Sequence, residues 1–322
     1  MAKTQKQGIS AGLLAALCLF IVAVSALLGR YFWLREKYHG EAVAYSRSAV
    51  KSLEEDSFDY KLARSFYTDE EWDALFDENY TVMEKDEEEI PPIEIEHICG
   101  STYEGYMMLV HRPEDVYVAV NPNMNNGRQA PSLEDYVKTD KAIAGINAGG
   151  FEDAGGTGNG GLAWGIVIHK GKLISGSMNT FLPIIAIDDD LKLMCVDATA
   201  ADALKWGAQE AVTFGPTFIS NYEVVYRNGD GDYPMLNPRT AIGQAGDGTF
   251  LLLVLDGRGP QSFGALYEDV IKIMRSYDAQ AAANLDGGNS TAMIYKGEYV
   301  NTTVSMYGSR HLPTVFLVKG DE

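Results

Sequence analysis

Cysteine is scarce in this 322-residue chain, which contains only Cys18, Cys99 and Cys195. No two of them have the CxxC spacing of a zinc or redox motif, and one pair at most is no disulfide framework. Cys99 and Cys195 could pair or could both be buried thiols, and the sequence leaves both alternatives open. The apolar fraction of 46% over this length is enough to bury a substantial core.

Basic side chains are also in short supply, because 26 Lys and Arg stand against 45 Asp and Glu, for a net charge of −19. Residues 1–37 hold five basic side chains and one acidic one, so the rest of the chain carries −23. Such an acidic surface repels phosphate backbones, and we therefore expect no nucleic-acid partner. An anionic substrate would need a local basic site within this overall negative field.

Histidine is infrequent, and none of the five histidines lies in a motif that would supply a base to a Ser290 nucleophile. The segment NGDGDY, residues 228–233, spaces its acids as a calcium loop does but lacks the other ligands and the closing Glu. The sequence therefore predicts no cofactor and no metal site.

One long apolar run is present, over residues 9–29. At 1.5 Å per residue it is long enough to cross a bilayer core of about 30 Å. Aromatic residues 31–33 follow it, as at a membrane interface. We therefore expect a cytoplasmic tail at 1–8, a single membrane anchor at 9–33, and the large domain on the extracytoplasmic side of the cell membrane. A signal peptide cleaved after VSA at 24–26 is the alternative.

Residues 34–92 have the pattern of an acidic helical stalk. Thr68 and Glu71 have the spacing of a capping box, and the apolar residues that follow share one helical face. The Pro91-Pro92 pair ends this segment.

Residues 93–322 alternate short apolar segments with tight turns. Strands are expected at 93–99, 106–110, 116–120 and 142–147, and hairpins at 164–175, 184–196 and 240–257. Two helices are expected, one at 132–138 capped by Ser132 and an amphipathic one at 263–277. Because hairpins dominate and helices are few, we predict an α+β domain on a largely antiparallel or mixed β-sheet.

Polar residues gather at the ends of four apolar strands, where scaffolds usually present reactive groups. They occupy INAGGFEDAGGTGNGG (146–161), FGPTFISNYE (214–223), NPRTAIG (237–243) and NLDGGNSTAM (284–293). The first is neither a Walker A loop nor a dinucleotide fingerprint, and the second is most simply a turn. The fourth combines one carboxylate with accessible backbone N–H groups, which suits an anionic or polyhydroxylated ligand.

The motifs INAGGF, NPRTAIG, NLDGGNSTAM and SRHLPTVFLV, in this order, resemble the phosphodiester glycosidase domain family, over about residues 95–320. That family includes an enzyme that removes N-acetylglucosamine from a phosphodiester, and many bacterial members are linked to exopolysaccharide. The resemblance implies a membrane-anchored hydrolase of a sugar-1-phosphodiester bond in a cell-surface glycan, its precursor or a related glycoconjugate.

The resemblance also implies roles for single residues. Asp286 would stabilise an oxocarbenium-like transition state, as nucleophile or as base for water. Arg239 and Arg310 match the family's arginines and would clamp the departing phosphate. Arg258 is a weaker third candidate for this clamp.

The remaining expected site residues would contact the substrate. Asn147 would read a sugar hydroxyl or acetamido group, and Asp153 or Glu152 would supply a second carboxylate. The other expected substrate-binding residues are Gly149, Gly150, Gly287, Gly288, Asn289, Ser290 and Thr291.

Two positions depart from the family pattern. Glu152 stands where the family often has a second aromatic residue, and Asn289 where it often has a third glycine. With the acidic surface, these departures support an alternative function, a non-catalytic module that binds anionic glycans or assists exopolysaccharide assembly. The sequence determines neither the sugar and aglycone nor the oligomeric state.

Overall fold

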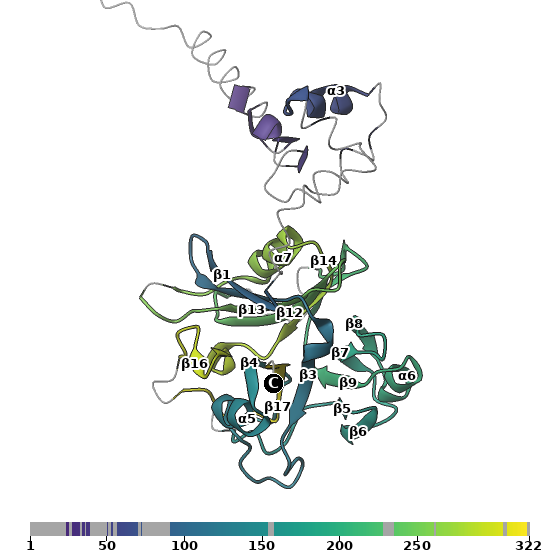
Figure 1. Cartoon of the computed structure of the whole chain (residues 1–322), viewed down its shortest axis with the longest axis vertical. Coiled ribbons are helices and arrows are strands. Elements are labelled where there is room, and N and C mark those ends of the chain that lie inside the picture. Colours follow the sequence, from purple (N-terminus) through teal and green to yellow (C-terminus); the bar gives the residue numbers. More distant parts are fainter. Residues whose placement is uncertain are drawn as a thin grey trace, which may run out of the picture. The chain divides into compact units, whose positions relative to one another are not determined.

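The computed structural model describes residues 91–320 except 154–157, 228–234, 261 and 305–307, together with residues 57–69 and scattered positions between 24 and 72. The chain divides into two compact units, Met1–Glu88 and Glu89–Glu322 (Figure 1).

The first unit contains the short helix α3 (Phe58–Arg64). Its N-cap is Ser57, whose side chain accepts a hydrogen bond of 3.1 Å from the Tyr60 N–H. The buried side chains Leu34, Tyr38, Val50, Ala63 and Trp72 form its apolar cluster.

Most of the expected membrane anchor and most of the expected stalk fall outside the described residues. Within the part of the chain that is described, no helix combines the length and the apolar character needed to cross a membrane.

The second unit contains three sheets. The first comprises, in spatial order, β1 (Ile93–Cys99), β2 (Glu104–Val110), β13 (Phe250–Leu255), β12 (Arg239–Ala245), β14 (Ala279–Leu285), β10 (Thr217–Ser220) and β11 (Glu223–Val224). The second comprises β16 (Glu298–Tyr299), β15 (Met293–Tyr295), β4 (Ala142–Asn147), β17 (Thr314–Lys319) and β3 (Val116–Val120). The third comprises β6 (Lys172–Ser175), β5 (Val167–His169), β9 (Glu210–Thr213), β7 (Leu182–Ile187) and β8 (Leu193–Ala198).

Few helices accompany these sheets, so the predicted α+β class is confirmed. They are α5 (Leu133–Asp140), α6 (Ala200–Lys205) and α7 (Tyr267–Ser276), with the 3-10 turns η1 (Pro113–Asp115) and η3 (Gly288–Ser290). Every pairing between the named strands is antiparallel. The alternative of a mixed sheet is thus not met among the described strands.

Helix α7 lies on one face of the first sheet (Figure 1). It begins at Tyr267, later than the predicted helix over 263–277. Gly264 has φ +114°, outside the helical region, and Leu266 is extended and forms the N-cap. The helix therefore begins at Tyr267, after these two residues whose backbone is not helical.

The main core is formed by all three sheets, and its large side chains include Met108, Ile146, Phe250 and Phe316. Because α7 covers the opposite face of the first sheet, every residue of β12 and β13 is buried. This explains why FLLLVL, residues 250–255, is continuously apolar instead of alternating.

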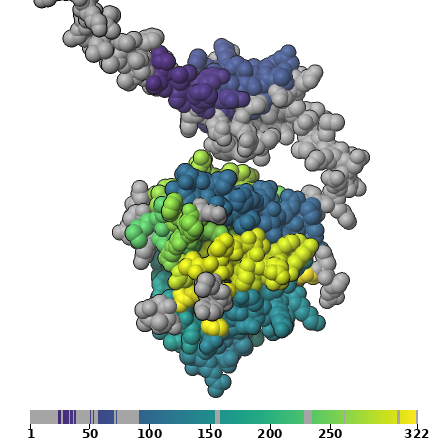
Figure 2. Space-filling view, turned by 90° about the vertical axis from the view of Figure 1, so that its left-hand side faces the viewer, coloured from purple at the N-terminus to yellow at the C-terminus, as the bar shows by residue number. Residues whose placement is uncertain are grey.

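The last strand of the chain, β17, lies inside the second sheet. Strand β17 lies between β3 and β4 in antiparallel pairing with both. Figure 2 shows the C-terminal part, in yellow, packed against blue and teal segments from the first half of the unit. Cys99 is exposed and Cys195 is buried, and both are free thiols.

Candidate active site

Two of the polar motifs lie on neighbouring strands of the first sheet. The register of β12 and β14 places Thr240 opposite Leu285. Antiparallel pairing therefore brings Arg239 and Asp286 to the same end of this sheet. The Asp286 N–H donates to the Ala148 carbonyl oxygen at 3.0 Å, which joins the INAGGF motif to the same place.

A cavity of about 350 Å³ lies at this end of the sheet. Its lining residues are Asp153, Phe214, Asn237, Arg239, Arg258, Tyr267, Asn284, Asp286, Gly287, Gly288, Asn289, Ser290 and Arg310. Its volume is within the range of small-molecule sites. Residues that are far apart in the chain, including the three candidate arginines, thus meet around the NLDGGNSTAM motif that contains Asp286.

The loop after Asp286 depends on its two glycines. A Cβ at Gly287 would lie 2.8 Å from the Pro238 carbonyl oxygen, too close for any side chain. Gly288 has φ +59°, in the left-handed region. The turn then places the Ser290 hydroxyl in a hydrogen bond with the Asp286 carboxylate.

Desolvation raises the pKa of Asp286 to about 6. The nearby Asp153 raises it further, while the Ser290 hydrogen bond and the charge of Arg310 oppose the shift. Asp286 lines the cavity and has intermediate exposure as a whole residue, while its carboxyl group is desolvated. This carboxylate can therefore accept a proton at near-neutral pH.

Asp153 is the second carboxylate of the cavity. Arg310 Nη1 and Nη2 donate to its two oxygens at 2.6 and 2.8 Å, and the Gly158 N–H donates at 2.6 Å. These contacts, the Arg310 hydrogen bond first, lower the pKa of Asp153. The two carboxylates thus have pKa values that are moved apart, the pattern of paired groups with different chemical tasks.

Arg239 is a buried residue of the cavity wall. Its Nε donates to the Ala265 carbonyl at 3.0 Å and its Nη2 to the Met235 carbonyl at 2.9 Å. Its guanidinium carbon lies 4.2 Å from the centre of the Tyr267 ring. Desolvation lowers the pKa of Arg239, so its charge is held in a place where water screens it weakly.

Arg258 is more exposed and has neutral partners. Its Nη1 donates to Asn289 Oδ1, and its Nη2 donates to Asn237 Oδ1 at 2.9 Å. Its backbone is left-handed, with φ +60°, which is costly for a residue other than glycine. No carboxylate among the described residues pairs with this guanidinium, so its positive charge is held beside the cavity by neutral amide oxygens.

Asn147 does not line the cavity, although the sequence places it among the substrate-binding residues. Its side chain is fully buried, and its Nδ2 donates to the backbone carbonyl of Asp286. Its Oδ1 accepts from Thr240 Oγ1 at 2.9 Å and from the Ala292 N–H at 3.1 Å. These contacts tie β4 and β12 to the loop that carries Asp286.

Four other expected residues also lie outside the cavity lining. The Gly149 N–H donates to a threonine hydroxyl of β17, and Gly150 packs beside an aromatic ring. Thr291 is buried with its hydroxyl 3.3 Å from that of Thr240. Glu152 does not line the cavity, so Asp153 is the one of the two acids that reaches it.

Sequence reasoning missed four lining residues, Phe214, Asn237, Tyr267 and Asn284. A signal existed for Asn284, since it lies two positions before Asp286 on a strand and so shares its face. Tyr267 had no such signal, because only the packing of α7 brings its ring to Arg239.

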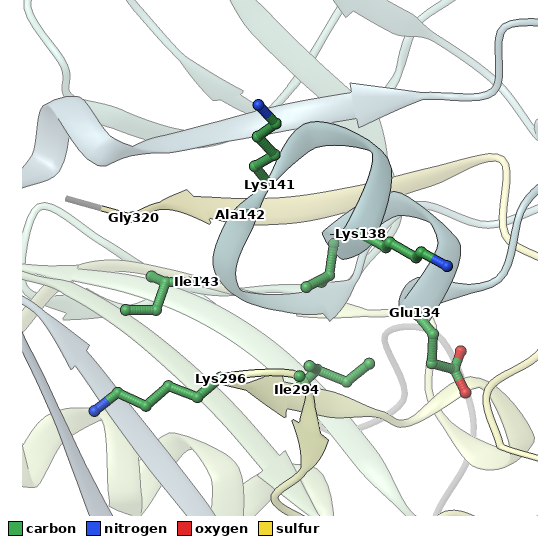
Figure 3. Close-up of a pocket in the computed structure, with 10 residues that line it drawn as sticks. Glu134, Lys138, Lys141, Ala142, Ile143, Ile294, Lys296 and Gly320 are labelled. Carbon is green, nitrogen blue, oxygen red and sulfur yellow. The ribbon is translucent and has the colours of Figure 1, made fainter. Parts of the chain in front are cut away.

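A second cavity, of about 620 Å³, lies between α5, β4 and the turn after β15. Three lysines line it, but Figure 3 shows the side chains of Lys138, Lys141 and Lys296 pointing in different directions. Its cationic groups do not converge on one point, unlike those around Asp286.

Within the described ranges, no three His, Cys, Asp or Glu side chains are grouped so that they could hold a metal ion. The calcium-like segment at 228–233 lies outside the described residues.

Solved structures similar to this chain agree on its fold. The catalytic domain of zebrafish N-acetylglucosamine-1-phosphodiester alpha-N-acetylglucosaminidase, auto-inhibited by its pro-peptide, is 22% identical, with a TM-score of 0.57 over 71% of this chain and 82% of that chain. An exported protein of Burkholderia pseudomallei K96243 is 15% identical, with a TM-score of 0.51 over 68% of this chain and 74% of that chain.

Sequence comparison gives a relative and a family. The SPbeta prophage-derived uncharacterized protein YomE of Bacillus subtilis (strain 168) is 28% identical over 172 residues, which are 51% of this chain and 26% of that protein. This chain therefore spans about a quarter of the length of the curated relative. Residues 140–319 match the phosphodiester glycosidase family, and because this match covers more than half of the chain, the protein belongs to that family.

Proposed function

We propose that this protein hydrolyses sugar-1-phosphodiester bonds at the anomeric carbon. The observation that carries the proposal is one cavity in which a carboxylate of raised pKa, Asp286, lies among three guanidinium groups. The family supports a glycosidase acting on phosphodiesters. A cell-surface glycan, its precursor or a related glycoconjugate is the substrate class that we propose.

Asp286 acts on the anomeric carbon. As a base it takes a proton from water while the water oxygen bonds to that carbon and the bond from the carbon to the phosphate oxygen breaks. The electron pair of that bond leaves with the phosphate oxygen, and the products are a free sugar and a phosphate monoester. As a nucleophile it would form a covalent intermediate that water then hydrolyses. Both routes need the ionised carboxylate.

The arginines stabilise the departing phosphate. A phosphate monoester leaves as a stable anion, so a cation beside it can replace a strong general acid. Arg258 is the best placed, because its guanidinium donates to the neutral amide oxygens of Asn289 and Asn237. Arg310 is held by Asp153 and adds positive charge beside Asp286, and Arg239 adds a weakly screened charge from the cavity wall.

The test is turnover by the full chain of a panel of sugar-1-phosphodiesters, with Asp286→Asn and Arg258→Ala as variants. Asp286→Asn should abolish release of free sugar while the protein still binds the substrate. Arg258→Ala should lower kcat/KM by about 100-fold or more, as loss of one donor to a developing oxyanion does. Binding by the wild-type protein without any turnover would favour the non-catalytic glycan-binding module.

The location of the protein is proposed from sequence alone. The apolar run at 9–29 supports a single-pass anchor with the catalytic domain on the extracytoplasmic side. Deletion of residues 1–33 should release the protein from the membrane fraction, and protease added to intact cells should cleave the full-length form. Protection from that protease would reverse the proposed orientation.

A further inference from the structure

Asn284 is a polar residue on the wall of the cavity with a single fixed orientation. Its residue is 2% exposed, and its Nδ2 donates to the Gly215 carbonyl oxygen at 3.0 Å. Rotating the amide by half a turn would set its oxygen against that carbonyl oxygen, so the contact fixes which end of the amide lies at Gly215. The acceptor oxygen, Oδ1, is therefore the end left for another partner.

That oxygen has no hydrogen-bond partner among the residues that the structure describes. A buried acceptor without a donor costs about 1–3 kcal/mol, so such an atom in a native protein calls for an explanation, which can be local strain, a bound water or ion, or a functional role. Neighbouring donors are directed elsewhere, since Ser290 bonds to Asp286 and Arg258 donates to Asn289 and Asn237. A molecule entering the cavity can supply the missing donor.

The position of Asn284 indicates which part of a ligand this is. Asn284 lies on β14, and Asp286 follows the end of that strand two positions later. Residues two apart in an extended chain point to the same face, and their backbones are about 7 Å apart. If Asp286 reaches the anomeric carbon, Asn284 reaches a group close to that carbon. The ring oxygen on one side cannot donate a hydrogen bond. The nearest donor in a pyranose is therefore the substituent on the neighbouring ring carbon, C2.

We propose that Asn284 Oδ1 accepts a hydrogen bond from the C2 substituent of the sugar, either a hydroxyl O–H or an acetamido N–H. This inference rests on the proposed function, because it takes Asp286 to face the anomeric carbon. It makes Asn284 a specificity-determining residue that selects sugars with a donor at C2 over 2-deoxy sugars.

The experiment compares three substrates that differ only at C2, namely methyl phosphodiesters of N-acetylglucosamine, glucose and 2-deoxyglucose linked through C1. The full chain and its Asn284→Ala variant are assayed on each. Intrinsic reactivity differs among these sugars, so the quantity compared is the ratio of kcat/KM between variant and wild type for each sugar. That ratio should fall by about 10-fold more for the preferred C2 donor than for the 2-deoxy sugar.

A matched control is Gln280→Ala. Gln280 is another amide residue of β14, four positions from Asn284, and its side chain bonds to Gln244 outside the cavity. For this variant, the ratio of kcat/KM to that of the wild type should be the same for all three sugars. The N-acetylglucosamine and glucose arms show which of the two donors the site prefers.

Binding separates this inference from the proposed function. The probes are three non-hydrolysable phosphonates in which a methylene group replaces the oxygen on C1, and calorimetry gives their Kd. A C2-dependent loss of affinity in Asn284→Ala supports the inference even if no substrate is turned over, an outcome that would contradict only the proposed hydrolysis.

Three outcomes overturn the inference. One is a wild-type protein that binds the 2-deoxy probe as tightly as the others. Another is an Asn284→Ala variant whose affinity or turnover falls equally for all three sugars, which would mean that Asn284 acts on water or on Asp286. The third is absence of binding for all three probes, which would count against both the inference and the proposed function.

Discussion

Arg310 and Asp153 are 157 positions apart in the chain, yet two hydrogen bonds of 2.6 and 2.8 Å join their side chains at the cavity. The pair keeps Asp153 ionised and places positive charge beside Asp286. The cavity therefore holds one carboxylate that stays charged and one that titrates at about pH 6.

The first prediction is that kcat/KM rises with pH through an apparent pKa of about 6. Asp286 must be ionised to act, and its raised pKa means that it is protonated below that value. A pH profile measured from 4.5 to 8.5 checks this. A profile that is flat across the range would show that no group with this pKa controls the reaction.

Arg310→Ala gives the control for that profile. The charge of Arg310 lowers the pKa of Asp286, and removing it also leaves the negative charge of Asp153 uncompensated. Both changes raise the pKa of Asp286, so the acid limb should move to higher pH. A limb that moves to lower pH would contradict this arrangement of Arg310, Asp153 and Asp286.

The second prediction concerns stability. Because the pKa of Asp286 is higher in the folded protein than in the unfolded chain, its contribution to stability is full below about pH 4 and is lost as pH rises through about 6. In Asp286→Asn the side chain cannot ionise, so the folded protein does not lose this stability as pH rises. The free energy of unfolding in urea should therefore rise by about 1–3 kcal/mol at pH 8, and this gain should vanish near pH 4.

Asp153→Asn is the matched variant with the opposite sign. The pKa of Asp153 is lowered by folding, so its contribution is present at neutral pH and is lost as pH falls. This variant should be less stable than wild type at pH 7, with the difference shrinking in acid. If both variants shift stability in the same direction at pH 8, the assignment of the two carboxylates is wrong.

The third prediction is that Asn147 stabilises the site without contacting substrate. Asn147→Ala leaves buried partners on Asp286, Thr240 and Ala292 without their hydrogen bonds, and the free energy of unfolding should fall by about 2–4 kcal/mol. Thr240→Val removes one hydroxyl of this network and should cost about 1 kcal/mol. A stable Asn147→Ala variant with a selective rise in KM would instead indicate the sugar contact expected from sequence.

The fourth prediction compares two glycines with positive φ. Gly288 has φ +59° and Gly297 has φ +83°, so alanine at either position should cost about 1–2 kcal/mol in backbone strain. A Cβ at Gly288 would also lie 3.3 Å from Arg258 Nη2, whereas nothing lies within 4 Å of one at Gly297. Only Gly288→Ala should therefore raise KM, and equal kinetic effects would contradict a role for Arg258 in binding phosphate.

Much of the fold follows from local sequence signals. Strands β1, β3 and β4 begin and end where alternation and apolar runs predict, and Ser132 caps α5 as expected. The arrangement of three sheets around one core does not follow from such signals, because strand pairings such as β17 with β3 depend on contacts between distant segments.

The site was predictable to a smaller extent. Asp286 and the candidate arginines are recognisable from their motifs, and the structure brings them together. Which arginine lacks a carboxylate partner depends on contacts between different segments of the chain. Arg310 meets Asp153 over 157 positions, and Arg258 meets Asn237 over 21. Motif and composition cannot reveal such contacts.

The most direct test of the central claim is hydrolysis of a sugar-1-phosphodiester by the full chain in water enriched in oxygen-18. If Asp286 acts at the anomeric carbon, as base for water or as nucleophile, the label appears in the C1 hydroxyl of the released sugar. The phosphate monoester then carries no label. Asp286→Asn should release no labelled sugar. Label found in the phosphate would show that water attacks phosphorus, and the proposed glycosidase chemistry would be contradicted.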